Sequence, residues 1–334
     1  MAREEVEVGA PLGEFALIER FFRACGAARA DVRLGVGDDA AVLVCPPDRN
    51  LVAALDTLVE GVHFPPGSPA DSIGHRALAA NLSDLAAMGA EPAWALLGLT
   101  MPRAEEHWLA QFSHGLSALA LEFGVALVGG DTTSGPLTVS LQLSGLIEPG
   151  TALTRAGGAA GEELFVSGSP GDAAAGLALE QARLALADEQ TASYLRARFL
   201  YPTPRVALGR RLREFASACI DVSDGLFADA DKLARASNCG AVLEYELLPV
   251  SRELVDAVGI ERARELALTG GDDYELIFSV PRSRVSALLD ALPPEQWAYR
   301  RIGALHNKRA TIVVRAGSVI DFSHRGFDHF AERR

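Results

Sequence analysis

Hydrophobic residues recur along the chain with two different spacings, which together predict both helices and strands. Apolar positions three to four residues apart, over stretches too long for strands, predict helices at residues 15–26, 71–90, 105–123, 173–185, 191–198, 206–216 and 227–237. Short apolar or alternating runs bounded by Gly, Pro or Asp predict strands at residues 40–45, 51–55, 94–100, 125–128, 137–147, 164–167, 218–221, 241–245, 274–280 and 311–314. Because both kinds occur in each half, the pattern predicts an α/β fold with mixed sheets.

The pattern is interrupted in the middle of the chain. Between residues 148 and 163 the sequence EPGTALTRAGGAAGEE loses its periodicity and gathers glycine, which is typical of a junction. The full length of 334 residues is enough for two domains at about 100–200 residues each, and 49% of the residues are apolar. We therefore predict an N-terminal domain at residues 1–149 and a C-terminal α/β domain at residues 150–334.

Charge and cysteine content exclude several classes of protein. The formal net charge of −13 has the wrong sign for a nucleic acid or an anionic membrane surface as partner. No apolar run approaches the ~20 residues of a membrane span, and the N-terminus has no apolar core of a signal peptide. The four cysteines form no CxxC pair and suit a reducing compartment. We expect a cytoplasmic protein that binds neither nucleic acid nor membranes.

Aspartates gather at the ends of the apolar segments. Six stretches place one or two of them beside Gly, Ser or Thr: GVGDDAAVL (35–43), LDTLVEGVHF (55–64), NLSDLAAMGA (81–90), GGDTTSG (129–135), DVSDG (221–225) and TGGDDYEL (269–276). A single aspartate of this kind is an ordinary turn or cap residue, but Asp84 lies inside a predicted helix that it does not cap. Without a Cys or His cluster, such carboxylates favour Mg²⁺ or Ca²⁺ over zinc, and no EF-hand loop is present.

A Mg²⁺ site would most naturally serve a phosphate ligand, because Mg²⁺ usually completes its shell with waters and phosphate oxygens. The chain has only two lysines, Lys232 and Lys308, and neither stands in a Walker A loop or in the strand position of a protein kinase. Both common kinase architectures are therefore excluded. The glycine-rich helix start GSPGDAAAGLALE (168–180) is only a weak indication of a phosphate site.

The motifs together resemble the thiamine-monophosphate kinase family of the aminoimidazole-ribonucleotide-synthetase-like superfamily. The resemblance covers nearly the whole chain, from GEFALIERFF (13–22) through the six acidic segments, HRALAANLSDLAAMGAEPAW (75–94) and ALTRAG (152–157) to RGFDHF (325–330). It implies transfer of the γ-phosphoryl group of ATP to thiamine monophosphate with several Mg²⁺ ions. It also implies a homodimer in which the sheets of two N-terminal domains form a barrel between the subunits.

The resemblance also implies roles for individual residues. The metal ligands would be Asp39, Asp56, Asp84, Asp131, Asp221 and Asp224. The nucleotide would be contacted by Gly130, Asp131, Arg155 and Ser223, and the thiamine phosphate by His63 and Asp272. No general base is expected, because a phosphate acceptor is largely a dianion at neutral pH.

Two positions depart from the family pattern. Family members commonly carry Ser-Thr before the aspartate of the DTLV motif, where this chain has Ala54 and Leu55. Ala54 has no hydroxyl to offer a metal, whereas Leu55 retains its backbone carbonyl as a ligand. Near the C-terminus, many members place a tryptophan against the substrate, where this chain has His324 with Phe322 nearby. Either side chain is a candidate to cover the thiamine ring.

Other functions remain open at this point. Aminoimidazole ribonucleotide synthetase couples ATP to an anionic substrate, but the NLSDLAAMGA and GGDDYEL segments fit the thiamine enzyme better. The selenophosphate and hydrogenase-maturation relatives need cysteines that this chain lacks at the corresponding places. A catalytically silent Mg-nucleotide-binding dimer would have lost some carboxylates, and an ATP phosphohydrolase would release ADP without an acceptor.

Overall fold

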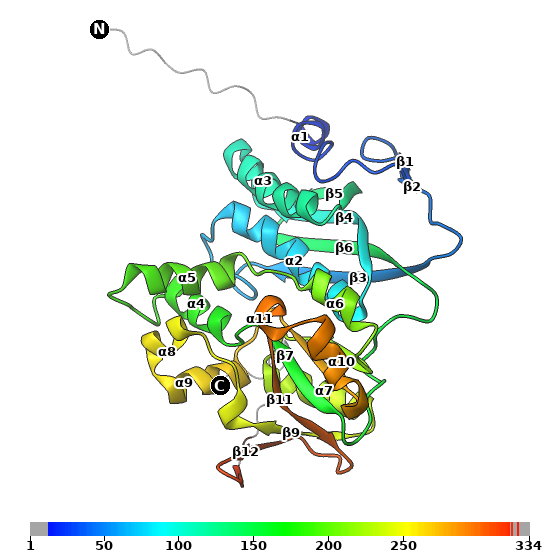
Figure 1. The fold of residues 1–334 in the computed structure, drawn as a ribbon. Coiled ribbons are helices and arrows are strands. Elements are labelled where there is room, and N and C mark those ends of the chain that lie inside the picture. Colours follow the sequence, from blue (N-terminus) through cyan, green and yellow to red (C-terminus); the bar gives the residue numbers. More distant parts are fainter. Residues whose placement is uncertain (1–12, 321, 323–325, 327–334) are drawn as a thin grey trace.

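The protein is built on two β-sheets with helices packed against them (Figure 1), as seen in a computed structural model that describes residues 13–320, 322 and 326. The four-stranded sheet uses residues 50–147 and the seven-stranded sheet uses residues 163–320. The predicted mixed α/β fold is confirmed. The predicted division between residues 149 and 150 falls in the segment that connects the sheets. No helix of the described residues is both long and apolar enough to cross a bilayer.

The N-terminal half surrounds the four-stranded sheet, whose strand order is β3-β6-β4-β5. Strands β4 and β5 are parallel and the other neighbours are antiparallel. The elements are α1 (Glu14–Phe21), β1 (Val32–Leu34), β2 (Val42–Leu43), β3 (Asn50–Val59), α2 (Ala70–Met88), β4 (Glu91–Met101), α3 (Glu106–Glu122), β5 (Ala126–Ser134) and β6 (Thr138–Ile147). Helices α2 and α3 cover one face. They meet closely at Gly115, where an added Cβ would lie 1.9 Å from the carbonyl oxygen of Asp71.

The opposite face of this sheet is covered only in part in the single chain: the β1 and β2 segment packs over Trp94 and Leu146, and the rest is the open face. Side chains of a strand alternate between two faces, and in β3 the alternate positions Leu51, Ala53, Leu55 and Thr57 are exposed. Leu55 is 64% exposed and Leu96 of the central strand β4 is 42% exposed. Exposed leucines on a central sheet are unusual for a surface that faces water alone.

The C-terminal half surrounds the seven-stranded sheet, ordered β13-β12-β9-β11-β7-β10-β8, in which only the β9–β12 pair is parallel among the described strands. Its elements are β7 (Glu163–Ser167), α4 (Asp172–Glu180), α5 (Glu189–Leu200), α6 (Val206–Leu212), β8 (Ala218–Asp221), α7 (Leu226–Ala236), β9 (Gly240–Glu244), the 3₁₀ helix η1 (Tyr245–Leu247), α8 (Arg252–Val258), α9 (Ile260–Thr269), β10 (Leu276–Val280), α10 (Arg282–Ala291), α11 (Pro294–Trp297), β11 (Tyr299–His306), β12 (Ile312–Arg315) and β13 (Ser318–Ile320). Helices α8 to α11 and strands β1, β11 and β13 were not predicted, and helices α4 and α6 end earlier than predicted.

Helix α2 joins the two halves. It packs against the four-stranded sheet on one side and against α6 of the C-terminal half on another. The approach to α6 is close at Gly209, where an added Cβ would lie 1.9 Å from the carbonyl oxygen of Ala86. The hydroxyl of Ser83 on α2 donates a 2.9 Å hydrogen bond to Asp221 at the end of β8. Residues from both halves therefore meet along this helix.

Candidate active site

A cavity of about 1030 Å³ lies where α2, β3 and the loops beside β8 and β10 meet. Most of the site residues predicted from the sequence line it: Leu55, Asp56, His63, Asp84, Arg155, Asp221, Ser223, Asp224 and Asp272. Asp56 belongs to β3, Asp84 to α2 and Asp221 to β8. Because β8 and β10 are neighbours that pair Asp221 with Leu276, the loop after one strand lies beside the loop before the other. The fold thus gathers motifs that are far apart in the sequence.

Three carboxyl groups in this cavity crowd one another. Burial, followed by the charges of Asp221 and Asp56, raises the pKa of Asp84 to about 8. Burial also raises the pKa of Asp56, although a hydrogen bond with Asp84 partly offsets that effect. Burial and the charge of Asp229 raise the pKa of Asp221 to about 6. Each group resists ionisation in this surrounding, so a cation placed among them would be strongly favoured.

Two basic side chains line the same cavity. The exposed Arg155 lowers the pKa values of Asp84 and Asp221 through its charge, and among the described residues its guanidinium has no ion-pair partner. Lys232 of α7 forms ion pairs with Asp224 and, at 2.7 Å, with the buried Asp229. Sequence reasoning missed Lys232 as a cavity residue. The sequence did contain an indication of its role, because Lys232 follows Asp229 by three residues and the two therefore lie on one face of a helix.

Asp229 organises the loop that carries Ser223 and Asp224. Its carboxylate accepts hydrogen bonds from the backbone N–H groups of both residues, at 3.0 and 2.9 Å. The ammonium of Lys232 pairs with Asp224 as well as with Asp229. A cation bound at Asp224 would therefore have to share this carboxylate with Lys232 or displace the ammonium.

The donor chemistry fits Mg²⁺ with few protein ligands. Carboxylate oxygens are what this ion prefers, and none of the crowded Asp56, Asp84 and Asp221 forms an ion pair with a basic side chain of the described residues. Within residues 13–320, 322 and 326, no three His, Cys, Asp or Glu side chains form a group that could hold one ion by themselves. An ion here would be shared between one or two carboxylates, waters and phosphate oxygens, which is the usual way in which Mg²⁺ binds beside a nucleotide.

His63 and Asp272 have defined positions at the edge of the cavity. The backbone N–H of Val59 donates to Nδ1 of His63 at 2.9 Å, which places the proton of a neutral ring on Nε2. Asp272 accepts a 2.9 Å hydrogen bond from Arg76 and a 3.3 Å bond from the hydroxyl of Tyr274. Arg76 and Tyr274 are further residues that sequence reasoning missed, although Tyr274 alternates with Asp272 in the same motif.

Three more of the predicted residues line a second cavity of about 890 Å³. Asp39, Gly130 and Asp131 lie there with Leu96, Gln142 and the side chains of α1 that face the sheet. Strand register puts Asp131 in one row with Gly98, Ser140 and Thr57, next to the row that contains Asp56. Adjacent rows face opposite sides of a sheet. In the single chain Asp131 therefore belongs to the open face, and Asp56 faces α2.

The two candidates for covering the thiamine ring have different outcomes. Phe322 packs edge-on against Phe227, with ring centroids 5.0 Å apart, at the margin of the C-terminal core. That contact already occupies the phenyl ring. His324 lies outside the described residues.

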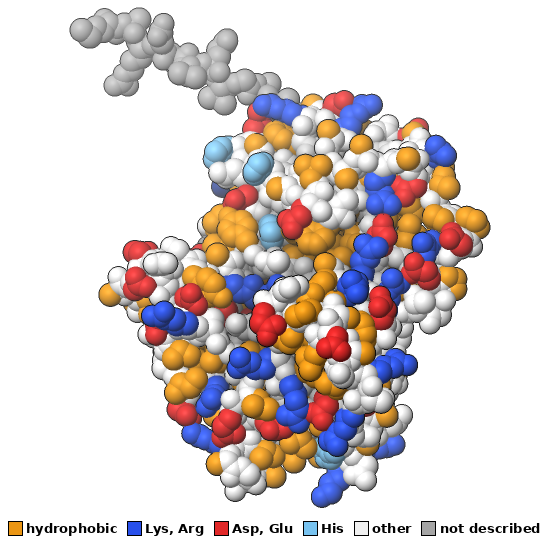
Figure 2. All heavy atoms as spheres, in the orientation of Figure 1, with side chains coloured by type: hydrophobic (Ala, Val, Ile, Leu, Met, Phe, Trp, Pro, Cys, Tyr) orange, Lys and Arg blue, Asp and Glu red, His pale blue; other side chains and the backbone are white. Residues whose placement is uncertain are grey.

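Charged side chains are otherwise well mixed on the molecular surface. On the face shown in Figure 2, acidic and basic side chains are interspersed over both halves. Inside the cavity the carboxylates Asp56, Asp84, Asp221, Asp224 and Asp272 outnumber the cations Arg155 and Lys232. A local excess of this kind is typical of a cation-dependent site rather than of general acidity.

Comparison with known proteins identifies the class to which this fold and cavity belong. Residues 37–147 match the AIR synthase related protein N-terminal domain, and residues 159–315 match the corresponding C-terminal domain. A thiamine-monophosphate kinase of Escherichia coli (strain K12) is 45% identical over 320 residues, which cover 96% of this chain and 98% of that protein. The enzyme of Bacillus subtilis (strain 168) is 32% identical over 311 residues, covering 90% and 94%.

Solved structures agree with the sequence relatives. Thiamine-monophosphate kinase from Stenotrophomonas maltophilia K279a has a TM-score of 0.80 and 45% identity, covering 85% of this chain and 92% of that one. AaThiL complexed with AMPPCP and TMP has a TM-score of 0.76 and 31% identity, covering 88% and 92%. The fold is thus that of the AIR synthase related proteins. Within that class, the chain belongs to the thiamine-monophosphate kinase family.

Proposed function

We propose that the protein transfers the γ-phosphoryl group of ATP to the phosphate of thiamine monophosphate, giving thiamine diphosphate and ADP. The observation that carries this proposal is the cavity of crowded carboxylates in a chain that is 45% identical to a thiamine-monophosphate kinase over 96% of its length. A relative of 31% identity was solved with AMPPCP and TMP together, which supports ATP and thiamine monophosphate as the two substrates.

The reaction needs charge neutralisation more than proton transfer. The acceptor phosphate has a second pKa of about 6, so it is already a nucleophilic dianion at neutral pH. Its approach to a triphosphate costs on the order of 4 kcal/mol for each like-charge pair at ~4 Å and an effective dielectric of 20. Mg²⁺, when bound, supplies neutralisation between the two phosphates and orients the attacking and leaving oxygens.

We assign the cation-binding role in this cavity to Asp56, Asp84, Asp221 and Asp224. The crowding and raised pKa values of Asp56, Asp84 and Asp221 support the assignment, because a site that resists ionisation on its own gains most from an added cation. Asp224 is included because it lines the same cavity. Asp39 and Asp131 remain predicted ligands that line the second cavity in the single chain. The backbone carbonyl of Leu55 remains a predicted ligand at the cavity wall.

The nucleotide and the acceptor are assigned to different parts of the cavity. Arg155 has a free guanidinium among the described residues and suits a phosphate oxygen. Ser223 lines the same cavity, and Gly130 is a further predicted contact. His63 and Asp272 are assigned to thiamine monophosphate. His324 remains a predicted contact of the thiamine ring.

The proposed assembly is a homodimer formed through the open face of the four-stranded sheet. Leu51, Leu55 and Leu96 are exposed there, at 55%, 64% and 42%. Pairing with the same face of a second copy would bury these leucines and close a barrel between the subunits. We also propose a cytoplasmic location, which is supported by four free thiols, of which Cys25, Cys219 and Cys239 are buried and Cys45 is exposed.

The function is tested by incubating the protein with ATP, Mg²⁺ and thiamine monophosphate and measuring both products. We expect equal amounts of ADP and thiamine diphosphate, and little ADP when the acceptor is omitted. ADP released at the same rate without acceptor would instead identify an ATP phosphohydrolase. Nucleotide binding without any turnover would identify a catalytically silent Mg-nucleotide-binding protein.

A further inference from the structure

The loop of residues 270–276 presents alternate side chains to two different surroundings. Asp272 and Tyr274 line the cavity, whereas Asp273 and Glu275 are fully buried on the other side. Asp272 and Tyr274 both have positive φ angles, 66° and 52°. Such a conformation costs a residue other than glycine about 1–3 kcal/mol and persists only where neighbouring contacts enforce it.

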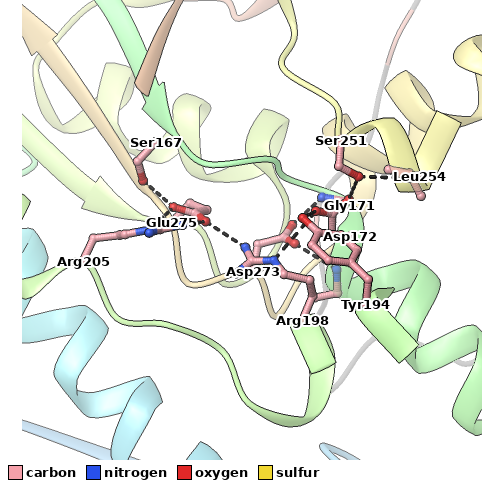
Figure 3. A network of polar contacts seen from close by, with 11 residues as sticks. Ser167, Gly171, Asp172, Tyr194, Arg198, Arg205, Ser251, Leu254, Asp273 and Glu275 are labelled. Carbon is pink, nitrogen blue, oxygen red and sulfur yellow. Dashed lines mark hydrogen bonds and ion pairs between the residues drawn. The ribbon is translucent and has the colours of Figure 1, made fainter. Parts of the chain in front are cut away.

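The buried side of this loop is firmly anchored (Figure 3). The carboxylate of Asp273 accepts hydrogen bonds from the backbone N–H groups of Gly171 and Ala173, at 2.7 and 3.1 Å. Glu275 accepts hydrogen bonds from Arg198 at 2.8 Å and from Arg205 at 2.6 Å, and another from Ser167. These contacts hold Asp273 and Glu275 in place. They do not involve the side chains of Asp272 and Tyr274, which face the cavity.

On the cavity side, the loop is held by Arg76 of α2. Its side chain is 1% exposed and its guanidinium donates to Asp272 at 2.9 Å. The same guanidinium donates to the backbone carbonyl of Phe199 and lies 4.1 Å from the centre of the Phe199 ring. Arg76 therefore connects a helix of the N-terminal half to a loop and a helix of the C-terminal half.

Stability alone is a poor reason for this buried arginine. A buried ion pair often contributes little, because desolvation offsets the attraction between the charges. The Nε–H of Arg76 is also buried without a hydrogen-bond partner among the described residues, which costs about 1–3 kcal/mol. An apolar side chain would fill the same space at a lower desolvation cost. The guanidinium is therefore better explained by a role in positioning the groups that it binds.

We propose that Arg76 is a positioning residue, which holds Asp272 in the orientation that receives thiamine monophosphate. Arg76 does not line the cavity and acts through Asp272, although its guanidinium also donates to the backbone carbonyl of His63 at 3.3 Å. The inference rests on the proposed function, because it deepens the role of the same cavity. It also explains how α2, which carries Asp84 two turns further along, is kept in register with the loop that meets the acceptor.

The test compares Arg76→Met and Arg76→Lys with the control Arg301→Met. Arg301 forms ion pairs with Glu163 and Glu244 on the seven-stranded sheet, away from this cavity. We expect Arg76→Met to raise KM for thiamine monophosphate at least tenfold, while KM for ATP and kcat change less than threefold. Arg76→Lys should recover part of this loss, because an ammonium can reach Asp272 but cannot bond the Phe199 carbonyl in the same geometry. The control should leave both KM values unchanged.

Two further measurements separate positioning from simple destabilisation. If Arg76 acts through Asp272, adding Arg76→Met to Asp272→Asn should change KM for thiamine monophosphate less than twofold further. Amide hydrogen exchange at residues 270–275 should become at least tenfold faster in Arg76→Met without any substrate. Unchanged exchange, or equal increases in KM for both substrates, would overturn the proposal. If the wild-type protein does not phosphorylate thiamine monophosphate, the proposed function fails, while the exchange measurement still tests how Arg76 holds the loop.

Discussion

Two groups of buried acidic side chains in this protein differ in what neutralises them. Glu275, Asp273 and Asp172 sit among Arg198, Arg205, hydroxyl groups and the N-terminus of α4 (Figure 3). Asp56, Asp84 and Asp221, in the cavity, are close to one another, and their nearest neutralising charge is Arg155, which has no ion pair with them among the described residues.

The pKa values of Glu275 and Asp84 reflect this difference, whereas burial raises the pKa values of Asp172 and Asp273 despite their partners. Two arginines and Ser167 lower the pKa of Glu275 although complete burial opposes them. Burial with two more carboxylates nearby instead raises the pKa of Asp84 to about 8. Internal cations make the first group part of the scaffold. The second group has no ion pair among the described residues, which is why we propose that it binds a cation from solution.

The strongest test of the difference between the two acidic groups is to remove one carboxylate from the cavity. Asp84→Asn should lower kcat/KM at least 100-fold at saturating Mg²⁺, because the cation between the phosphates loses a ligand. The same substitution replaces a carboxyl group whose ionisation the site disfavours with a neutral amide, so the free energy of unfolding should stay equal or rise. Steady-state kinetics and urea unfolding of one preparation measure both. Near-normal turnover would show that Asp84 does not bind a catalytic cation.

The opposite outcome is expected for the paired group. Glu275→Gln leaves Arg198 and Arg205, which are only 14% and 24% exposed, without their shared carboxylate. Breaking a buried pair from one side costs about 3–5 kcal/mol. Urea unfolding should show a loss of this size. The control Glu163→Gln, whose partners Arg282 and Arg301 are 71% and 38% exposed, should lose less than about 1 kcal/mol. Equal losses would remove the distinction between buried and exposed pairs.

Asp172 gives the paired group a pH dependence of predictable sign. Burial raises its pKa to about 6, although bonds from Ser251 and Tyr194 and the charge of Arg198 partly offset this. The folded protein therefore holds this proton more tightly than the unfolded chain, and the stabilisation is lost as pH rises from about 4 through about 6. The loss is on the order of 2–3 kcal/mol. Asp172→Asn should lack this component in unfolding measured from pH 4 to pH 7, and parallel curves for the two proteins would contradict the assignment.

Much of the fold and of the cavity follows from sequence pattern, for identifiable reasons. Helix α2 was predicted from its periodicity, and Asp84 stood out because an aspartate inside a helix caps nothing. Strand β3 was predicted to end near Leu55 because the apolar run becomes polar there, yet it continues to Val59. Pairing with β6 extends the strand, since Val59 lies opposite Thr138. Long-range pairing of this kind leaves no local signal.

The residues that were missed depend on contacts between distant segments. Arg76 meets Asp272 across 196 positions of sequence, and nothing beside Arg76 distinguishes it from a surface arginine. Tyr274 was placed in a strand, but the strand begins at Leu276 and Tyr274 has a positive φ that the buried side of the loop imposes. Helices α8 and α9, in contrast, had a local signal, because Ser251 caps the first and Gly259, at φ 77°, separates them.

The smallest expected effect is the response of the apoprotein to Mg²⁺ alone. If the cavity carboxylates bind a cation, Mg²⁺ at ten times its dissociation constant should stabilise the folded state by about 1.4 kcal/mol, or roughly 2 °C in Tm. Glu163→Gln should respond like the wild type, because its pairs with arginine lie on the seven-stranded sheet. Asp84→Asn should respond by less than 1 °C. Thermal unfolding at matched ionic strength, with NaCl replacing MgCl₂, separates site binding from general screening, and an equal response in all three proteins would show that Mg²⁺ does not bind at the cavity without a nucleotide.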